Sequence, residues 1–292
     1  MIGVVVSLAA ALAWAGSSTI LKYLSSKVDA ISLNAIRLWV GSIILLSFVF
    51  LSGRAGELFQ TDSLAIVTVA VSGIVAVAIG DTVYIKSLSF LDVSHAYPIA
   101  QSVFPVLVLL TAILFLDESF AWVNILGGAL VLLGIYLITR TGKSRTADRI
   151  TGRGVALALI AAALWAGGSI ALKFGVTEMD SFVAAAIRIP AAAVILTGLV
   201  LSQRRWYRLQ FPKYSTCTVL LLVSTGILTY GVAAVCYVLA IQLLGVGKTV
   251  LLTAVSPLFL LPLSVFILKE HLRLPALVGV LISVAGMCLV AL

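Results

Sequence analysis

Long apolar runs, separated by short polar segments, fill almost the whole of this chain. A helix crosses the hydrocarbon core of a bilayer with roughly 20 apolar residues, and stretches of that kind recur along the sequence. They lie near residues 2–22, 31–51, 63–89, 94–116, 121–140, 154–174, 181–201, 215–243, 246–268 and 274–292. Continuous apolar runs favour helices over a closed barrel, because lipid leaves each span to satisfy its own backbone groups. We therefore predict an all-α integral membrane protein with ten transmembrane helices.

The second half of the chain repeats the pattern of the first half. Residues 11–23 read ALAWAGSSTILKY, and residues 162–174 read AALWAGGSIALKF. Five helices per half is an odd number, so the second half enters the membrane from the opposite side. The pattern predicts two inverted five-helix repeats, at 1–140 and 154–292, joined by a basic linker at 141–153. Inverted repeats around a central site are typical of secondary transporters.

The composition of the chain indicates that lipid is its solvent. Hydrophobic residues make up 62% of the sequence and charged residues 10%, whereas soluble domains carry roughly 25% charged residues. The chain has no Walker motif and no spacing typical of metal ligands. We therefore expect no ATP drive, no cofactor, no metal and no catalytic residue.

The net charge of +8 arises mainly from two loops, at 140–153 and 203–214. Basic loops next to membrane spans usually mark the cytoplasmic side and do not indicate a nucleic-acid partner. The charge pattern predicts that both loops are cytoplasmic in a multi-pass protein of the cell membrane, plasma or inner. Both chain ends would then face outside.

Asp81 is the acidic residue that lies deepest in an apolar run. Charged groups at membrane depth are costly and are functional candidates by default. Its counterpart in the second half is Val232, so the symmetry of the repeats does not explain it. Asp81 would bind an amine group of a substrate or carry a coupling proton. The structural alternative is a salt bridge to Arg37, Lys22 or Lys86.

Four basic residues occupy equivalent positions in the two halves, where they would carry coupling or charge-pairing roles. Arg37 and Arg188 lie in the second span of each half. Their guanidinium groups would clamp an anion, or they would pair with a helix end as part of the fold. Lys22 and Lys173 end the first spans. They would extend to the membrane interface or attract anions to the rim of a cavity.

Aromatic and hydroxyl side chains within the spans are further candidates for substrate binding. Rings would form the wall of a pocket or pack helices tightly. Hydroxyls would donate to a ligand or bond back to their own helix. Together with Asp81, the candidates are Trp14, Ser18, Tyr84, Tyr97, Gln101, Trp165, Ser169, Tyr237 and Thr253.

These motifs, in the same order in both halves, resemble the drug/metabolite transporter superfamily and specifically its ten-helix EamA-type members. The resemblance rests on Trp14–Lys22 with Trp165–Lys173, Arg37 with Arg188, Gly80, Tyr84, Ala96–Ile99, Leu116–Glu118, Pro105 with Pro257, and Gly127, Gly128 and Gly134 with Gly279 and Gly286. It implies two EamA repeats and a pocket lined mainly by the first, third, fourth, sixth, eighth and ninth helices. It also implies cytoplasmic chain ends, opposite to the charge pattern.

The function we expect is secondary active transport of a small metabolite such as an amino acid, as an exporter, by alternating access between the repeats. Two alternatives stay open: transport of phosphorylated metabolites or nucleotide sugars, and a non-transporting membrane scaffold of the same fold. An enzyme is not expected, because His95 and His271 lie far apart and no catalytic motif occurs in a span. Proton coupling and a homodimer formed through the glycine-rich fifth and tenth helices stay open as well.

Overall fold

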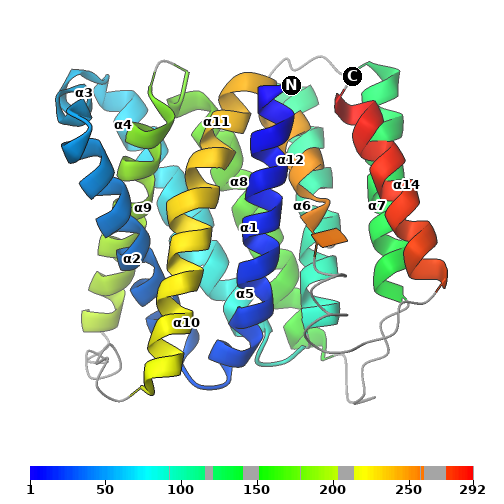
Figure 1. The fold of residues 1–292 in the computed structure, drawn as a ribbon, viewed down its shortest axis with the longest axis horizontal. Coiled ribbons are helices and arrows are strands. Elements are labelled where there is room, and N and C mark those ends of the chain that lie inside the picture. Colours follow the sequence, from blue (N-terminus) through cyan, green and yellow to red (C-terminus); the bar gives the residue numbers. More distant parts are fainter. Residues whose placement is uncertain are drawn as a thin grey trace.

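Helices make up all of the regular structure in the described part of the chain and form a bundle in which some helices stand in front of others (Figure 1). The computed structural model describes residues 1–91, 93–115, 121–140, 151–177, 179–202, 214–256, 258–259 and 274–291. Six helices in this part are long and apolar enough to cross a membrane. They correspond to the first three spans predicted in each half. The protein is therefore an all-α protein of the multi-pass membrane type.

The first half contains a series of helices that match the predicted spans within a few residues. Its elements are α1 (Ile2–Ser25), α2 (Ala30–Leu51), η1 (Arg54–Gly56), α3 (Glu57–Gln60), α4 (Ser63–Ser72), η2 (Gly73–Gly80), α5 (Asp81–Ser87), α6 (Val93–Phe115) and α7 (Trp122–Arg140). The elements α4, η2 and α5 form one continuous span.

The second half follows the same order. Its elements are α8 (Gly152–Gly175), α9 (Ser181–Ser202), α10 (Thr216–Gly226), η5 (Ile227–Ala233), α11 (Ala234–Leu244), α12 (Val246–Thr253) and α14 (Leu274–Ala291). The predicted span 246–268 is described only as α12 and a few residues after it. Most of the two basic loops, residues 141–150 and 203–213, lies outside the described residues.

Aspartates that recur in both halves begin the second helices. The Asp29 side chain accepts a hydrogen bond from the Ser32 backbone N–H at the start of α2. Asp180, its counterpart, accepts from the backbone N–H groups of Phe182 and Val183 at the start of α9. Such capping satisfies backbone donors that a helix start otherwise leaves free. The repeated aspartate therefore has a local structural cause.

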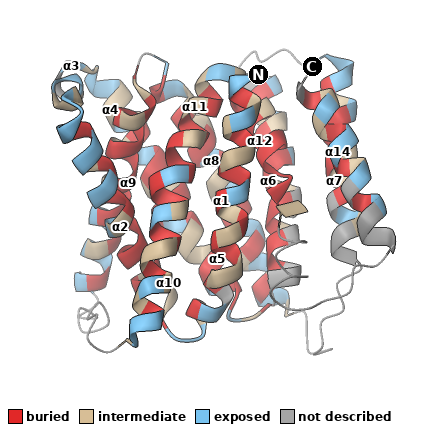
Figure 2. Cartoon of the chain, in the orientation of Figure 1, coloured by how far each residue is buried: buried red, intermediate tan, exposed pale blue. Residues whose placement is uncertain are grey.

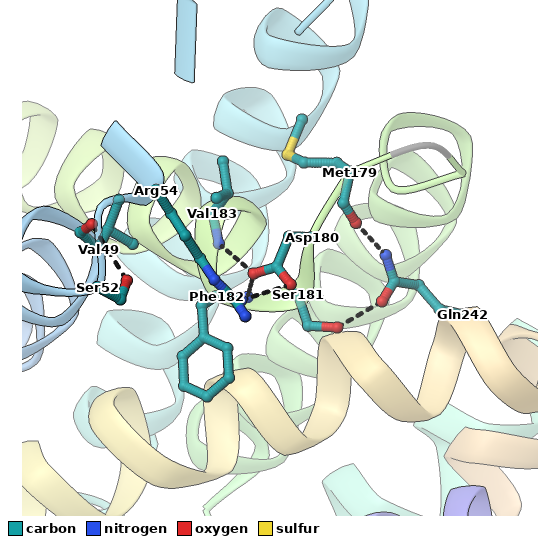
Figure 3. Close-up of polar contacts among 9 residues, drawn as sticks. All are labelled: Val49, Ser52, Arg54, Met179, Asp180, Ser181, Phe182, Val183 and Gln242. Atoms are coloured by element: carbon teal, nitrogen blue, oxygen red, sulfur yellow. Dashed lines mark hydrogen bonds and ion pairs between the residues drawn. The ribbon is translucent and has the colours of Figure 1, made fainter. Parts of the chain in front are cut away.

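A small polar cluster joins the two halves at one end of the bundle (Figure 3). Arg54, which follows α2, forms an ion pair with Asp180 at 2.7 Å. Its guanidinium lies 5.8 Å from the ring centre of Phe182. Beside it, Gln242 of α11 accepts a hydrogen bond from Ser181 and donates to the carbonyl oxygens of Val176 and Met179. These contacts position the start of α9 against α11.

π-helical turns interrupt the third span of each half at equivalent places. They are η2, directly before Asp81, and η5, which contains Tyr230. A π-helical turn widens the helix and changes the direction of the following side chains, and such turns are frequent at functional sites. A glycine that begins η2 or directly precedes η5 contacts the other half. A Cβ on Gly73 would overlap the carbonyl oxygen of Arg188, and one on Gly226 would lie 2.9 Å from that of Arg37.

The main contacts between helices pair one half with the other. Helix α1 packs on η5 and α11, α8 packs on α4, η2 and α5, α2 packs on α9, and α7 packs on α14. Buried residues lie between these pairs, whereas exposed positions recur on outward faces (Figure 2). Many of those exposed positions carry large apolar side chains: Ile43, Phe50, Leu64, Leu114, Trp122, Leu220 and Leu281. An apolar exterior suits contact with lipid.

The glycine-rich helices α7 and α14 pack against each other within the chain. A Cβ on Gly127 would lie 2.7 Å from the carbonyl oxygen of Gly286, and one on Gly286 would lie 2.5 Å from that of Gly127. Small residues let two backbones approach this closely. The glycines of α7 and α14 therefore serve packing within one chain in this structure.

Candidate functional site

A cavity with an empty volume of about 820 Å³, counting the space at its mouth, lies between the two halves. Its walls come from α1, α2, η2, α5 and α6 in the first half and from α8, α9, η5 and α11 in the second. Among the described residues, α12 contributes none to the lining. The second helices of both halves do contribute, which the resemblance did not imply.

Most of the candidates drawn from the sequence meet around this cavity. Nine substrate-binding candidates line it: Trp14, Ser18, Asp81, Tyr84, Tyr97, Gln101, Trp165, Ser169 and Tyr237. Both arginines, Arg37 and Arg188, line it as well. The residues that meet here belong to helices far apart in the sequence.

Two candidates lie elsewhere, and one is not described. Thr253 is buried in α12 and donates a hydrogen bond to the carbonyl oxygen of Val250 at 3.1 Å, one turn earlier. Its hydroxyl therefore bonds to its own helix and does not line the cavity. Lys173 is absent from the lining too, because it lies near the end of α8. The side chain of Lys22 lies outside the described part of the structure.

The carboxylate of Asp81 is held by residues of the other half. Its Oδ1 accepts a hydrogen bond from Trp165 Nε1 at 2.7 Å. Its Oδ2 lies 2.7 Å from the hydroxyl of Tyr230. Within the described part, Asp81 forms no ion pair with Arg37 or Lys86, so the salt bridge to these residues that the sequence left open is not formed. Asp81 instead bridges the two halves through an indole and a phenol.

Asn34 of α2 completes this polar centre, although the sequence analysis did not select it. Its Oδ1 lies 2.5 Å from the hydroxyl of Tyr230. Its Nδ2 donates to the Val77 carbonyl oxygen at 2.9 Å and to Thr82 Oγ1 at 3.0 Å. Asn34 is fully buried. The signal that could have found it is an amide in the middle of an apolar span, with Ala185 at the equivalent place of the other half.

Replacement of Asn34 by alanine is expected to lower the free energy of unfolding by about 1–3 kcal/mol, the cost of leaving a buried polar group without its partner. The change removes the amide that satisfies a carbonyl of η2. The measurement is thermal unfolding of the purified protein in detergent. Thr68→Ala is the matched control, because this exposed hydroxyl bonds only to its own helix. Equal melting temperatures for the two variants would contradict the assigned role.

The two arginines are buried and face the same cavity. Arg37 is 2% exposed and Arg188 is 5% exposed. Arg37 donates to Ser17 at 3.1 Å and to Thr229 at 2.8 Å, and its Nε has no hydrogen-bond partner. Arg188 donates through Nε to Ser72 at 3.0 Å. No carboxylate of the described residues lies within ion-pair distance of either guanidinium. A buried cation without a counter-ion is costly in free energy, so a bound negative group would stabilise these arginines.

Aromatic rings line much of the rest of the cavity. Trp14 lies 5.2 Å from Tyr237, and Trp165 lies 5.3 Å from Tyr84, between ring centres. The hydroxyl of Tyr237 also bonds to Ser169 at 2.8 Å. The buried hydroxyl of Tyr84 has no hydrogen-bond partner, whereas that of Tyr97 lies near Ser256 and Gln101. The cavity thus offers apolar surface with a few polar groups able to orient a ligand.

Sequence comparisons agree with this architecture. The sequence pattern described as the EamA-like transporter family matches residues 1–140 and, again, residues 152–292. An uncharacterized transporter of Archaeoglobus fulgidus is 23% identical over 292 residues, which is 100% of this chain and 99% of the relative. A solved crystal structure with 17% sequence identity covers 98% of this chain and 95% of its own, with a TM-score of 0.77. That structure shares the fold. Since the family pattern covers nearly the whole chain in two copies, the chain belongs to the EamA-like transporter family.

Proposed function

We propose that this protein is a secondary active transporter that exports a small metabolite such as an amino acid. In this proposal, ten helices form two inverted five-helix repeats, and the cavity between them opens to each side of the membrane in turn. The observation that carries the proposal is the cavity itself, whose walls come from both halves and whose lining includes two buried arginines and one half-buried aspartate. Secondary transporters place their sites at such repeat interfaces.

Each half makes similar contacts with the other half, which supports the inverted arrangement. The first helix of each half packs on the third span of the other half. Glycines near the start of each π-helical turn, Gly73 and Gly226, pack on the backbones of Arg188 and Arg37 respectively. Helices α1 and α8 run in opposite directions, and both chain ends lie at one edge of the bundle (Figure 1). A pseudo-two-fold relation of this kind gives two arrangements of similar energy, as alternating access requires.

The chemistry of the lining supports an amino acid as the substrate. A guanidinium fork matches a carboxylate in shape and charge. The rings of Trp14, Trp165 and Tyr84 offer surface for an apolar or aromatic side chain. Both carboxylate oxygens of Asp81 already lie against Trp165 and Tyr230. The Tyr84 hydroxyl and the Gln101 amide are among the lining groups able to accept from an amine.

A phosphorylated metabolite or nucleotide sugar is the second candidate substrate. The observation that favours it is the pair of buried arginines without a carboxylate partner among the described residues. Arginine binds phosphate as readily as it binds carboxylate. The abundance of aromatic surface in the cavity favours the amino acid over this alternative.

The orientation of the protein in the cell membrane is part of the proposal. The end of α7 and the start of α8, which flank residues 141–150, lie at the edge opposite the chain ends (Figure 1). The basic loops 140–153 and 203–214 would face the cytoplasm, with the chain ends outside. In a variant whose native cysteines are replaced by serine, accessibility of Ile2→Cys to an impermeant thiol reagent in whole cells would distinguish this orientation from its reverse.

Uptake into sealed proteoliposomes tests the function. Labelled L-phenylalanine, L-leucine, a sugar phosphate and a nucleotide sugar are each offered with and without a pH gradient. We expect uptake of L-phenylalanine above that of protein-free vesicles, because the arginines suit its carboxylate and the aromatic rings suit its phenyl group. Uptake of the phosphate compounds alone would replace the amino acid by the second candidate. Binding without flux of any compound would indicate a non-transporting scaffold.

A further inference from the structure

If the Asp81 carboxylate is ionised, the groups around it have one hydrogen atom too few to form all of their short contacts as hydrogen bonds. The hydroxyl of Tyr230 lies 2.7 Å from Asp81 Oδ2 and 2.5 Å from Asn34 Oδ1. A phenol has one hydrogen, whereas an amide oxygen and an ionised carboxylate only accept. With Asp81 ionised, one of the two short oxygen–oxygen contacts would therefore lack a hydrogen, which costs free energy in a buried site.

The orientation of the Asn34 amide does not remove this shortage. Its Nδ2 faces the Val77 carbonyl oxygen at 2.9 Å and Thr82 Oγ1 at 3.0 Å. The hydroxyl of Thr82 donates in turn to the Ala78 carbonyl oxygen. Exchanging the amide oxygen and nitrogen would place Oδ1 against the Val77 carbonyl oxygen, an acceptor against an acceptor. The amide oxygen consequently points at Tyr230.

A proton on Asp81 completes the network. The carboxylic acid then donates from Oδ2 to the Tyr230 oxygen, and the Tyr230 hydroxyl donates to Asn34 Oδ1. The indole of Trp165 continues to donate to Oδ1. Each short contact now has one hydrogen, and each hydrogen has one acceptor.

The charged neighbours of Asp81 are cationic. Arg37 of α2 and Arg188 of α9 line the same cavity, and Arg37 lies 4.9 Å from the ring centre of Tyr230. The titratable phenols that line it are Tyr84 of α5, Tyr97 of α6, Tyr230 of η5 and Tyr237 of α11. The described lining residues of α1 and α8 are Trp14, Ser17, Ser18, Leu21, Trp165 and Ser169, none of which is charged. With Asp81 neutral, the cavity holds two cations and no anion of its own among the described residues.

We propose that Asp81 is a proton-binding site that acts together with an organic-carboxylate site at Arg37 and Arg188, so that the cavity takes up one proton and one carboxylate together. Ionised Asp81 offsets part of the positive charge of the arginines. When Asp81 is neutral, only a bound anionic ligand can offset that charge. Binding of the proton and binding of the carboxylate therefore favour each other, and this coupling is reciprocal. The proton comes from water and returns to water, and no covalent bond to carbon changes. The coupling rests on the proposed transport function, in which the proton would leave together with the exported carboxylate and the outward gradient of the carboxylate would drive both.

Direct binding of phenylacetate, measured by calorimetry on the purified protein between about pH 6 and about pH 9, tests the coupling. A carboxyl group with an ordinary pKa of about 4 stays ionised over this range, so the probe itself does not titrate. We expect the affinity to fall by about 5- to 150-fold as the pH rises, the usual range for coupled sites. Repeating the titration in buffers of different ionisation enthalpy counts the protons taken up with phenylacetate. Phenylacetamide, of the same shape without the charge, is expected to bind with no dependence on pH.

Asp81→Asn is the decisive variant, because an asparagine has the hydrogen-bond pattern of a protonated aspartate. Its amide oxygen accepts from Trp165, and its amide nitrogen donates to the Tyr230 oxygen. We expect its affinity for phenylacetate to equal the acid-side value of the wild type at every pH. Asp62→Asn, at the exposed start of α4, is the matched control and should keep the wild-type dependence.

Three results would overturn the coupling: pH dependence unchanged in Asp81→Asn, wild-type affinity that does not vary with pH, or binding of phenylacetamide without phenylacetate. None of these depends on flux. Failure of the transport function appears separately, as absence of uptake of every labelled compound in vesicles that hold protein able to bind phenylacetate.

Discussion

Replacement of Arg188 by glutamine is expected to lower the initial rate of L-phenylalanine uptake by at least about 30-fold at subsaturating concentration. Removing one member of a buried charge pair costs about 2–5 kcal/mol, and each 1.4 kcal/mol corresponds to about a factor of ten. Arg188 is 5% exposed, lines the cavity and has no carboxylate partner among the described residues. The bound substrate would supply that partner.

Two further variants show whether the loss comes from the binding site. Arg188→Lys retains the charge without the two-pronged geometry, so an intermediate rate is expected. Arg54→Gln removes an arginine whose ion pair with Asp180 is partly exposed and lies outside the cavity lining. Such pairs contribute at most about 1 kcal/mol, and uptake should stay near wild type. Rates are compared per mole of folded protein. An unchanged rate in Arg188→Gln would remove this arginine from the binding site.

Replacement of Gly73 by alanine is expected to produce the largest loss of stability among the alanine replacements of Gly73, Gly226 and Gly167. The added Cβ would overlap the carbonyl oxygen of Arg188, and a backbone atom cannot move aside as a side chain can. Overpacking of this kind costs about 1–3 kcal/mol, and occasionally more. The expected result is a lower melting temperature in detergent, together with displacement of Arg188 from the cavity.

The repeat provides a graded series for this test. Gly226→Ala places its Cβ 2.9 Å from the Arg37 carbonyl oxygen, a less severe contact, and a smaller loss is expected. Gly167→Ala is the matched control, because a Cβ there meets no other atom within 4 Å and alanine favours the helix. Melting temperatures should therefore decrease in the order Gly167→Ala, Gly226→Ala, Gly73→Ala. Equal values for all three would contradict the close approach of the two halves at these glycines.

Much of the helical framework could be predicted from the sequence because lipid imposes a simple rule. A span must satisfy its own backbone groups, so length and continuity of the apolar run are enough to locate it. The helices α1, α2, α8 and α9 match the predicted spans closely for this reason. The π-helical turns η2 and η5 were not predicted, because they change the local hydrogen-bond pattern without interrupting the apolar run.

The residues of the candidate site also differ in how far the sequence could predict them. Asp81, Arg37 and Arg188 could be selected from the sequence because charge inside a span is costly wherever it points. Asn34 and Thr229 were missed, since a neutral polar group in a helix often bonds to its own backbone. Thr253 was selected and does just that. The cost of a buried polar group is visible in a sequence, whereas its partner is not.

By itself, the sequence determined the class of protein, the places of most spans, the presence of a repeat and the unusual charges within the spans. Each of these follows from interactions between a residue and its solvent or its own helix. Only the tertiary structure decided that Trp165 and Tyr230 of the second half hold Asp81 of the first. It also decided that the arginines share one cavity with Asp81 and that α7 packs on α14. The two hydrogen bonds to Asp81 join residues 84 and 149 positions apart, and their geometry arises only when the two halves pack together.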